Sequence, residues 1–509
     1  MVAQDSRKAS KAGRNRFRNF PADLLAGVSV ALVLIPQALA YAELAGLDAV
    51  VGLLAAGLPL VVAAPIASSP YLQTGPTALL SLLTFGSLSV LYEPGTFGYA
   101  SAAAYLALLV GFIRVIMGLA RLGAVAYFMS QPVMQGFTSA AAMLILMSQL
   151  PAALGVSAAA ANPARGFLDA IGDPGEWDPL SIVFSAGTVL IVLAAQRISP
   201  LLPGVLAAVV LGVVGSNLLG FEGPVVGTID SLLAGQLSLV LPWQDTPDLL
   251  LGAVVIAIVG FAEPAAIARS YSTGRSWDPD RELVSQGAAN VVSGVLGSFP
   301  VGGSFSRSAL NRAAGARTRW SVFCTGVTVL LALPLVGLLA PLPKAVLAGV
   351  VISAVYRLVR PRSLLRLWRY ARLQAVVAFV TFGLTLVLAP RMDVAVLIGI
   401  ALAIAVHLYR EMDLDIESGV DGEVLVLKLS GVLWFGSTHL LEDYARDLFP
   451  PPPEVRRLRI DGTAVGRVDL TGSLELDAIL TEAQNHGLEV EVVGLRPHMK
   501  RVLERIRRG

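Results

Sequence analysis

The chain has few charged residues and a single cysteine. Asp, Glu, Lys and Arg make up 15% of its 509 residues, whereas hydrophobic residues make up 55%. Soluble domains usually carry about 25% charged residues, so this balance excludes an ordinary soluble domain and indicates a polytopic membrane protein. Cys324 has no partner for an internal disulfide, and a net charge of +2 gives no indication of nucleic-acid binding.

The sequence also lacks the patterns on which most catalytic sites depend. We find no nucleophile paired with a base, no cluster of residues at metal-ligand spacing and no phosphate-binding loop. We therefore expect a protein that is not an enzyme and that uses neither a cofactor nor a metal ion.

The first 410 residues contain fourteen apolar runs, which predict fourteen transmembrane segments in a lipid bilayer. Several are short for a hydrocarbon core of about 30 Å, and 76–91 and 304–312 are the least adequate. Short, glycine-interrupted segments are typical of transporter binding sites. The other runs are 22–41, 47–64, 101–119, 124–149, 181–195, 203–219, 248–268, 283–298, 320–339, 343–358, 374–389 and 393–409.

Positive charge is distributed unevenly among the connections of these runs. Connections after even-numbered runs hold most of the arginines, whereas the others hold only Arg165, Lys344 and Arg391. Because positive residues gather on the cytoplasmic side, we expect both chain termini there. The first run has no clear cleavage site, so we interpret residues 1–20 as a cytoplasmic N-terminal arm rather than a signal peptide.

Two pairs of segments recur at nearly equal offsets. LVLIPQALAYAELAG from Leu32 corresponds to IAIVGFAEPAAIARS from Ile256, and SSPYLQTGPTALLS from Ser68 corresponds to GSFPVGGSFSRSAL from Gly297. They divide the transmembrane domain, 21–410, into two sets of seven segments, one at about 21–220 and one at about 245–410. Since seven is odd, the halves form an inverted repeat whose short helices meet near the middle of the membrane.

The composition changes after Arg410 to the alternation of a small soluble α/β domain. This domain covers 411–509 and is expected in the cytoplasm. Strands are predicted at 423–429, 455–461 and 488–495, and helices at 437–448, 471–486 and 497–508.

The stretch PVGGSFSRSALNRAAGARTR, 300–319, combines a break in an apolar segment with a short helix that carries Arg307. Gly303 and the glycine before it permit unwinding, and Ser304 or Ser306 can cap the helix. A helix N-terminus inside a membrane binds anions, and an arginine at this depth requires an anion or a carboxylate nearby. The alternative is that Arg307 extends to the membrane interface and serves no site.

The start of a second short helix and one face of the first run complete this site. Thr77 and the free N–H groups of its turn would face the helix of Arg307. Gln37 and Tyr41 are at positions i and i+4 of the first run, so they share one face. Gln37 can donate to an anion and Tyr41 can close the pocket wall, although a glutamine or tyrosine packed between helices is the commoner case. Together these residues predict an anion-binding pocket.

Glu263 is the acid that lies deep within an apolar run. A carboxylate at this depth is expected to be functional or paired. Burial favours its protonated form and a nearby Arg307 favours its ionised form. We favour proton coupling over sodium coupling, because Val259 and Ile267, one turn to either side, offer no side-chain oxygen to a cation. The alternative is an ion pair of Glu263 with Arg307 that only holds the two halves together.

The sequence resembles the SulP family of anion transporters, also called solute carrier family 26, over nearly its whole length. The resemblance implies a seven-plus-seven inverted repeat of the uracil-transporter type, with a core domain and a gate domain that move as an elevator. It also implies a homodimer. The residues that carry it are DLLAGVSVALVLIPQALAYAELAG (23–46), SSPYLQTGPTALLS (68–81), RELVSQGAANVVSG (281–294), GSFSRSALNRAAGARTR (303–319) and the C-terminal domain.

The resemblance also implies roles for individual residues. Glu263 matches the acidic position that is linked to proton or sodium coupling in bacterial members of the family. The anion site would consist of Gln37, Tyr41, Thr77, Ser304, Phe305, Ser306 and Arg307.

The tail is similar to the sulfate transporter and anti-sigma factor antagonist (STAS) domain, with DGTAVGRVDLTG (461–472) at its signature turn. Anti-sigma factor antagonists carry a phosphorylatable serine there, whereas this chain has Leu470 beside Thr471. Phosphoserine signalling at Leu470 is therefore excluded, and we expect a role in regulation, in assembly or in binding a cytoplasmic partner.

We expect a secondary transporter in the inner membrane of a bacterium that imports a small anion with protons. Small residues at Ala78 and Ser304 would accommodate a dicarboxylate such as fumarate, which we place ahead of sulfate and bicarbonate. The alternatives are an uncoupled anion channel and a membrane anion sensor that signals through the STAS domain. A channel has no evident need for Glu263, and the missing phosphorylatable serine weakens the sensor hypothesis.

Overall fold

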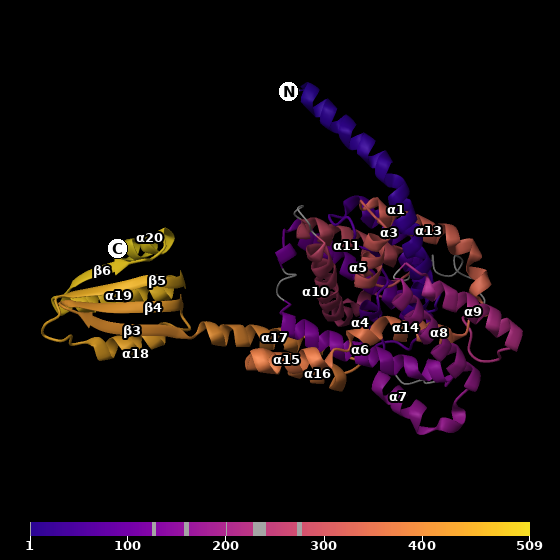
Figure 1. Ribbon diagram of the computed structural model, residues 1–509. Helices are drawn as coiled ribbons and strands as arrows, with labels where there is room; N and C mark the ends of the chain where they lie inside the picture. The colour runs from indigo at the N-terminus through magenta and orange to yellow at the C-terminus, as the bar shows by residue number, and fades with distance from the viewer. Residues whose placement is uncertain are drawn as a thin grey trace. The chain divides into compact units, whose positions relative to one another are not determined.

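The computed structural model describes residues 2–124, 129–156, 162–199, 201–227, 241–271 and 277–508, with side chains from Asn19 onwards. The chain divides into two compact units, Met1–Ile400 and Ala401–Gly509. The first consists of helices and two very short strands, and the second is an α/β domain (Figure 1). The division falls within α17 (Met392–Glu411), close to the boundary at 410 that the composition predicts.

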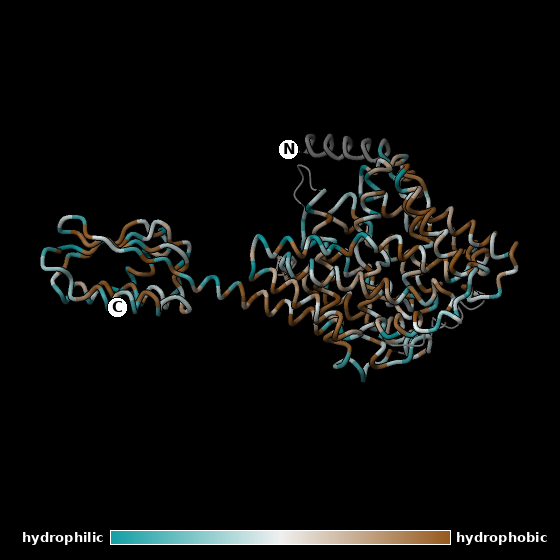
Figure 2. Tube along the Cα trace, turned by 60° about the horizontal axis from the view of Figure 1, so that its bottom comes forward, coloured by the Kyte–Doolittle hydropathy of each residue, from teal (hydrophilic) through white to brown (hydrophobic). Residues whose placement is uncertain are grey.

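Helices coincide with all fourteen predicted apolar runs wherever the structure describes them, and residues 125–128 of the run 124–149 lie outside the described residues. In the described part of the chain, seven helices are long and apolar enough to cross a membrane, and hydrophobic residues continue along most helices of this unit (Figure 2). The matching elements are α1 (Val2–Leu44), α2 (Val51–Ala56) with α3 (Leu58–Ile66), α4 (Ala78–Leu88), α5 (Phe97–Leu119), α6 (Gln131–Leu154), α8 (Pro179–Ile198), α9 (Gly204–Leu219), α10 (Thr246–Ser270), α11 (Pro279–Val295), α12 (Phe305–Ala313), α13 (Trp320–Ala332), α14 (Lys344–Val355), α16 (Arg372–Val387) and α17.

Three features differ from the sequence-based expectation. Helix α1 begins at Val2, so the expected N-terminal arm, 1–20, continues without a break into the first apolar run. Two connections contain helices of their own, α7 (Pro163–Gly172) and α15 (Pro361–Tyr370). Both are short and amphipathic, which is why a search for apolar runs does not find them.

The helices of the first unit pack in two groups. In one group, α11 packs on α5 and α3, α13 packs on α1 and α3, and α10 packs on α5 and α4. In the other, α6 packs on α14 and α16, and α8 packs on α9 and α14. Contacts of α1 with α9 and α14, and of α4 with α6, join the groups, which correspond to the core and gate domains that we expect.

Two short strands cross in the first group. Strand β1 (Thr74–Gly75) pairs antiparallel with β2 (Gly302–Gly303), with Thr74 opposite Gly303 and Gly75 opposite Gly302. Because β1 leads into α4 and β2 leads into α12, the two short helices start at one crossing and run in opposite directions. An inverted repeat produces this arrangement.

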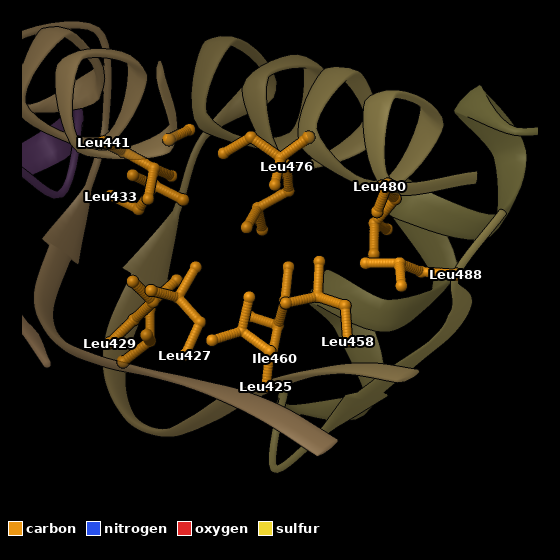
Figure 3. Close-up of a cluster of buried hydrophobic side chains, with 14 of the residues drawn as sticks. Leu425, Leu427, Leu429, Leu433, Leu441, Leu458, Ile460, Leu476, Leu480 and Leu488 are labelled. Carbon is orange, nitrogen blue, oxygen red and sulfur yellow. The ribbon is translucent and has the colours of Figure 1, made fainter. Parts of the chain in front are cut away.

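The second unit is a four-stranded sheet covered by helices. The strand order is β3-β4-β5-β6, and β3 pairs antiparallel with β4 while the other pairs are parallel. Leucine and isoleucine side chains of the sheet and of the helices α18 and α19 fill its core (Figure 3). The elements are β3 (Leu414–Asp421), β4 (Val424–Leu433), α18 (Thr438–Leu448), β5 (Arg457–Val468), α19 (Leu470–Asn485), β6 (Glu489–Val493) and α20 (Pro497–Ile506).

Candidate anion-binding site

The crossing of β1 and β2 fixes the starts of α4 and α12 against each other. The pairing continues beyond the strands, because Ser304 N donates to the carbonyl of Gln73 over 3.0 Å. Gln73 N in turn donates to Ser308 Oγ over 2.9 Å. The N-terminal turn of α12 is therefore attached to the segment that leads into α4, although the two lie far apart in the sequence.

Side-chain oxygens cap both helices. Thr77 Oγ1 accepts from Leu80 N at 3.4 Å, so α4 begins at Ala78, two residues after Pro76. Ser304 Oγ accepts from Arg307 N at 3.5 Å and lies 3.2 Å from Ser306 Oγ. Of the two serines that can cap α12 by sequence, Ser304 does so. The remaining N–H groups of each first turn give this region a positive potential.

Arg307 is buried at the first turn of α12 with most of its donors free. Its side chain is 1% exposed, and Nη1 donates to Gln37 Oε1 on α1 over 3.4 Å. Its Nε and Nη2 have no hydrogen-bond partner. A Cβ atom at Gly75 would lie only 3.4 Å from Nη2, so the guanidinium rests against the backbone of β1. An anionic group is the kind of ligand that can satisfy the unpartnered donors of a buried guanidinium.

Glu263 on α10 interacts with α12 through the backbone. Its Oε1 accepts from Phe305 N over 3.3 Å. Glu263 and Arg307 are both within the described part of the chain, and no ion pair of 4.0 Å or less joins them there. The alternative in which Glu263 and Arg307 form a fixed pair is therefore not observed, and Arg307 keeps its free donors.

A cavity of about 410 Å³ lies between the two helix groups and contains part of the predicted site. Gln37, Ser306 and Arg307 line it. Tyr41, Thr77, Ala78, Gly303 and Ser304 are buried around the crossing and do not line it, whereas the side chain of Phe305 is 46% exposed. The structure thus brings the predicted residues close to one crossing. Three of them form part of the cavity wall, and the others lie outside it.

A second cavity, of about 550 Å³, lies at the other end of the contact between α1 and α14. None of the predicted site residues lines it. Glu43 and Lys344 line it and form an ion pair with 3.0 Å between Oε1 and Nζ. The ion pair therefore connects the two helix groups where α1 ends and α14 begins, six residues beyond Gln37.

Arg114 is a second buried arginine, which was not predicted from the sequence to have a role. Arg114 on α5 is fully buried and donates to the carbonyls of Ala257, Val301 and Ile256 over 3.2, 3.0 and 3.0 Å. Asn290 on α11 bonds the N–H and the carbonyl of Val301, both over 2.9 Å. Together the two side chains hold the residue before β2 against α10. The signal in the sequence that could have identified Arg114 is its charge inside the apolar run 101–119.

A buried carboxylate, Glu282, holds the matching segment before β1. Its Oε2 accepts from the N–H and the hydroxyl of Ser68 and from Ser69 N, at 2.9 to 3.1 Å. Gln286, one turn later on α11, donates to Thr74 Oγ1 over 2.8 Å. Polar side chains of α11 thus position both segments that lead into the crossing, and sequence reasoning did not identify them.

Comparisons with known proteins agree with this architecture. The model of the sulfate permease family matches residues 20–381, and the model of the STAS domain matches residues 415–507. A sodium-independent sulfate anion transporter of Bos taurus is 30% identical, with 94% of this chain and 85% of that protein covered. A probable sulfate transporter of Mycobacterium tuberculosis is 29% identical, with 94% of this chain and 90% of that protein covered.

Solved structures have the same fold. Murine solute carrier 26 family member A9, an anion transporter in the inward-facing state, matches with a TM-score of 0.86 at 20% identity, over 95% of this chain and 87% of that chain. The transmembrane domain of a cyanobacterium bicarbonate transporter, BicA, matches with a TM-score of 0.64 at 23% identity, over 76% of this chain and 98% of that chain.

These findings confirm the predicted fold class, a polytopic helical membrane protein with a STAS domain, and the expectation of a transporter rather than an enzyme. The chain belongs to the sulfate permease, or SulP, family of membrane anion transporters.

Proposed function

We propose that this protein is a secondary active transporter that carries a small anion together with protons across the inner membrane of a bacterium. The observation that carries the proposal is Arg307, which is 1% exposed, lines a cavity and keeps Nε and Nη2 without partners. An unpaired guanidinium is costly at this depth, and an anion supplies the missing acceptors.

The position of the cavity supports an elevator-type alternating-access mechanism. Its wall combines α1 and α12 from one helix group with α8, α9 and α14 from the other. A relative movement of the groups would carry the bound anion past the contact between α1 and α14. The ion pair of Glu43 with Lys344 would then open as the other cavity gains access to the site.

Glu263 is the proposed proton carrier. It accepts a hydrogen bond from Phe305 N in the first turn of α12 and forms no ion pair with Arg307. Its protonation state is therefore free to change when an anion binds. A neutral Glu263 beside an anion and Arg307 leaves a smaller net charge in the moving group, which lowers the cost of crossing hydrocarbon. Sodium coupling is the less favoured form of the same proposal.

A dicarboxylate such as fumarate is the proposed substrate. The proposal rests on the small residues Ala78 and Ser304 at the two helix starts, which would accommodate a planar diacid near Arg307 if the bound anion reached beyond the cavity wall to the crossing. Sulfate is the second candidate, because the relatives from cattle and mycobacteria carry that anion in their names. Bicarbonate is a third candidate, suggested by the name of the cyanobacterial neighbour.

We also propose that the protein is a homodimer with both termini in the cytoplasm. The placement of the termini rests on the arginine-rich connections, such as the one that contains Arg357 and Arg366. The STAS domain would then face the cytoplasm, where Thr471 is exposed near the start of α19.

Uptake into liposomes that contain the purified protein tests the proposal. Labelled fumarate, sulfate, bicarbonate and chloride are compared at external pH 5 and pH 7.5, with and without sodium. The proposal predicts sodium-independent uptake of one of these anions that is faster at pH 5. Absence of flux for all four under every gradient contradicts it and favours a sensor, whereas flux that ignores the pH gradient favours a channel.

A further inference from the structure

We infer that Arg357 is a second anion contact, at the mouth of the Arg307 cavity, and that it gives the cavity a preference for doubly charged anions. The inference rests on the proposed function, because it assigns the substrate class of the same cavity. In the sequence, Arg357 is one of the positive charges that mark a cytoplasmic connection.

The cavity wall is positively charged. Arg307 and Arg357 are the two ionisable residues of its wall, and within the described part of the chain no carboxylate lines it. Gln37, Gln196, Ser306 and Ser353 supply the uncharged polar atoms. Two full positive charges without an acid produce a field that attracts anions and grows with the charge of the ligand.

The two arginines come from opposite walls. Arg307 belongs to α12, which packs with α1 and α10, whereas Arg357 lies in the 3-10 turn η5 (Tyr356–Leu358) directly after α14. Arg307 is buried, and Arg357 is exposed. An anion between the helix groups would thus meet one cation on each side, the deep one being fixed and the outer one accessible to water.

Local contacts orient Arg357 without neutralising it. Its Nε donates to the hydroxyl of Tyr356 over 2.6 Å, and its Cζ lies 5.3 Å from the centroid of the same ring. In the part of the chain that the structure describes, no ion pair with a carboxylate involves Arg357. The guanidinium therefore retains its full charge and has donors left for a ligand.

Coulomb's law gives this arrangement a quantitative signature. The energy between Arg357 and a bound anion is proportional to the charge of the anion. Neutralising Arg357 should therefore lower the affinity for a monoanion by some factor. For a dianion of similar shape, the affinity should fall by the square of that factor. For an exposed arginine at physiological salt we expect about threefold for a monoanion and about ninefold for a dianion.

Binding measurements on the full-length purified protein test the inference. Fumarate is compared with monomethyl fumarate, and sulfate with methanesulfonate, at pH 7.5 in wild type, Arg357→Gln and Arg357→Lys. We expect the squared relation in Arg357→Gln, near wild-type affinity in Arg357→Lys, and an effect that shrinks at about 1 M salt. Arg366→Gln, an exposed arginine of α15 outside the cavity wall, is the matched control and should change neither affinity.

The outcomes separate this inference from the proposed function. If wild type binds none of the four anions, the role of Arg357 is overturned, and the proposed function then depends on the uptake of bicarbonate and chloride. If Arg307→Gln abolishes binding while Arg357→Gln leaves it unchanged, or lowers monoanion and dianion affinity by the same factor, the proposed function stands and the role of Arg357 is overturned. An equal loss of affinity in Arg366→Gln also contradicts the role of Arg357, because a positive charge outside the cavity wall would then have the same effect on binding.

Discussion

The carboxylate of Glu263 on α10 accepts the backbone N–H of Phe305 at the first turn of α12, over 3.3 Å. The same turn carries Arg307, whose Nη1 reaches Gln37 on α1. A proton on Glu263 and an anion at Arg307 would therefore act on one helix start. This geometry gives a physical route by which the two binding events can influence each other.

Neutralising Arg307 should weaken anion binding more than any other single change in the cavity. A hydrogen bond to a charged group contributes about 1.5–3 kcal/mol, so Arg307→Gln should raise the dissociation constant about 10- to 100-fold. Titration calorimetry on the purified protein measures this change. Arg197→Gln, an exposed arginine at the end of α8, is the control. Unchanged affinity in Arg307→Gln would remove Arg307 from the site.

Gly75 is a position where the backbone conformation requires glycine and where Arg307 packs against the strand. Its φ of +141° is unfavourable for other residues, and a Cβ there would lie 3.4 Å from Arg307 Nη2. Gly75→Ala should therefore strain β1 and reduce thermal stability, and a shifted β1 should also lower anion affinity because Arg307 packs against this strand. Gly383→Ala in α16, where a Cβ would meet nothing within 4 Å, should leave both nearly unchanged. Equal behaviour of the two variants would show that the β1 crossing tolerates a side chain.

Arg114 should stabilise the segment that leads into β2. Removing three hydrogen bonds from a buried guanidinium is expected to cost more than about 2 kcal/mol, because such bonds contribute about 1.5–3 kcal/mol each. Arg114→Ala should thus lower the thermal midpoint clearly, and Arg114→Lys should recover only part of the loss, since lysine lacks the planar fork. A midpoint equal to wild type in Arg114→Ala would mean that Asn290 alone holds Val301.

Breaking the ion pair of Glu43 with Lys344 should shift the protein away from the observed conformation. Their side chains are 22% and 44% exposed, so the pair contributes at most about 1 kcal/mol, or roughly fivefold in a conformational equilibrium. In a Cys324→Ala background, Ser353→Cys places a thiol in the wall of the site cavity. Adding Glu43→Gln should slow its labelling by a polar thiol reagent. Faster or unchanged labelling would argue that the ion pair of Glu43 with Lys344 does not hold the second cavity apart from the site.

Hydropathy and charge were sufficient to predict most of the fold. The apolar runs correspond to helices because burial in lipid requires long apolar segments whatever their packing partners. Strand β3 was not predicted, because Leu414 is the only one of its eight residues that is buried and the remainder reads as a polar connection. Its position is determined by the edge of β4, which the local sequence does not reveal.

The candidate site was predictable where its chemistry lies in side chains. Ser304 and Arg307 follow a glycine break, and this pattern indicates a capped helix inside a membrane. The attachment of Gln73 to Ser304 and Ser308 was not predictable, because backbone pairing between distant segments leaves no local signal. The partners of Arg114 were not predictable either, because they are backbone carbonyls of distant segments and leave no local signal in the sequence.

The central claim, coupling of anion and proton movement through Glu263, is tested most directly by following both fluxes in one experiment. Liposomes that contain the protein and an internal pH-sensitive dye receive an inward gradient of the transported anion with equal pH on both sides. We predict internal acidification during uptake by wild type and none by Glu263→Gln, which keeps an oxygen for Phe305 N. Anion uptake by wild type without any change of internal pH would contradict the account.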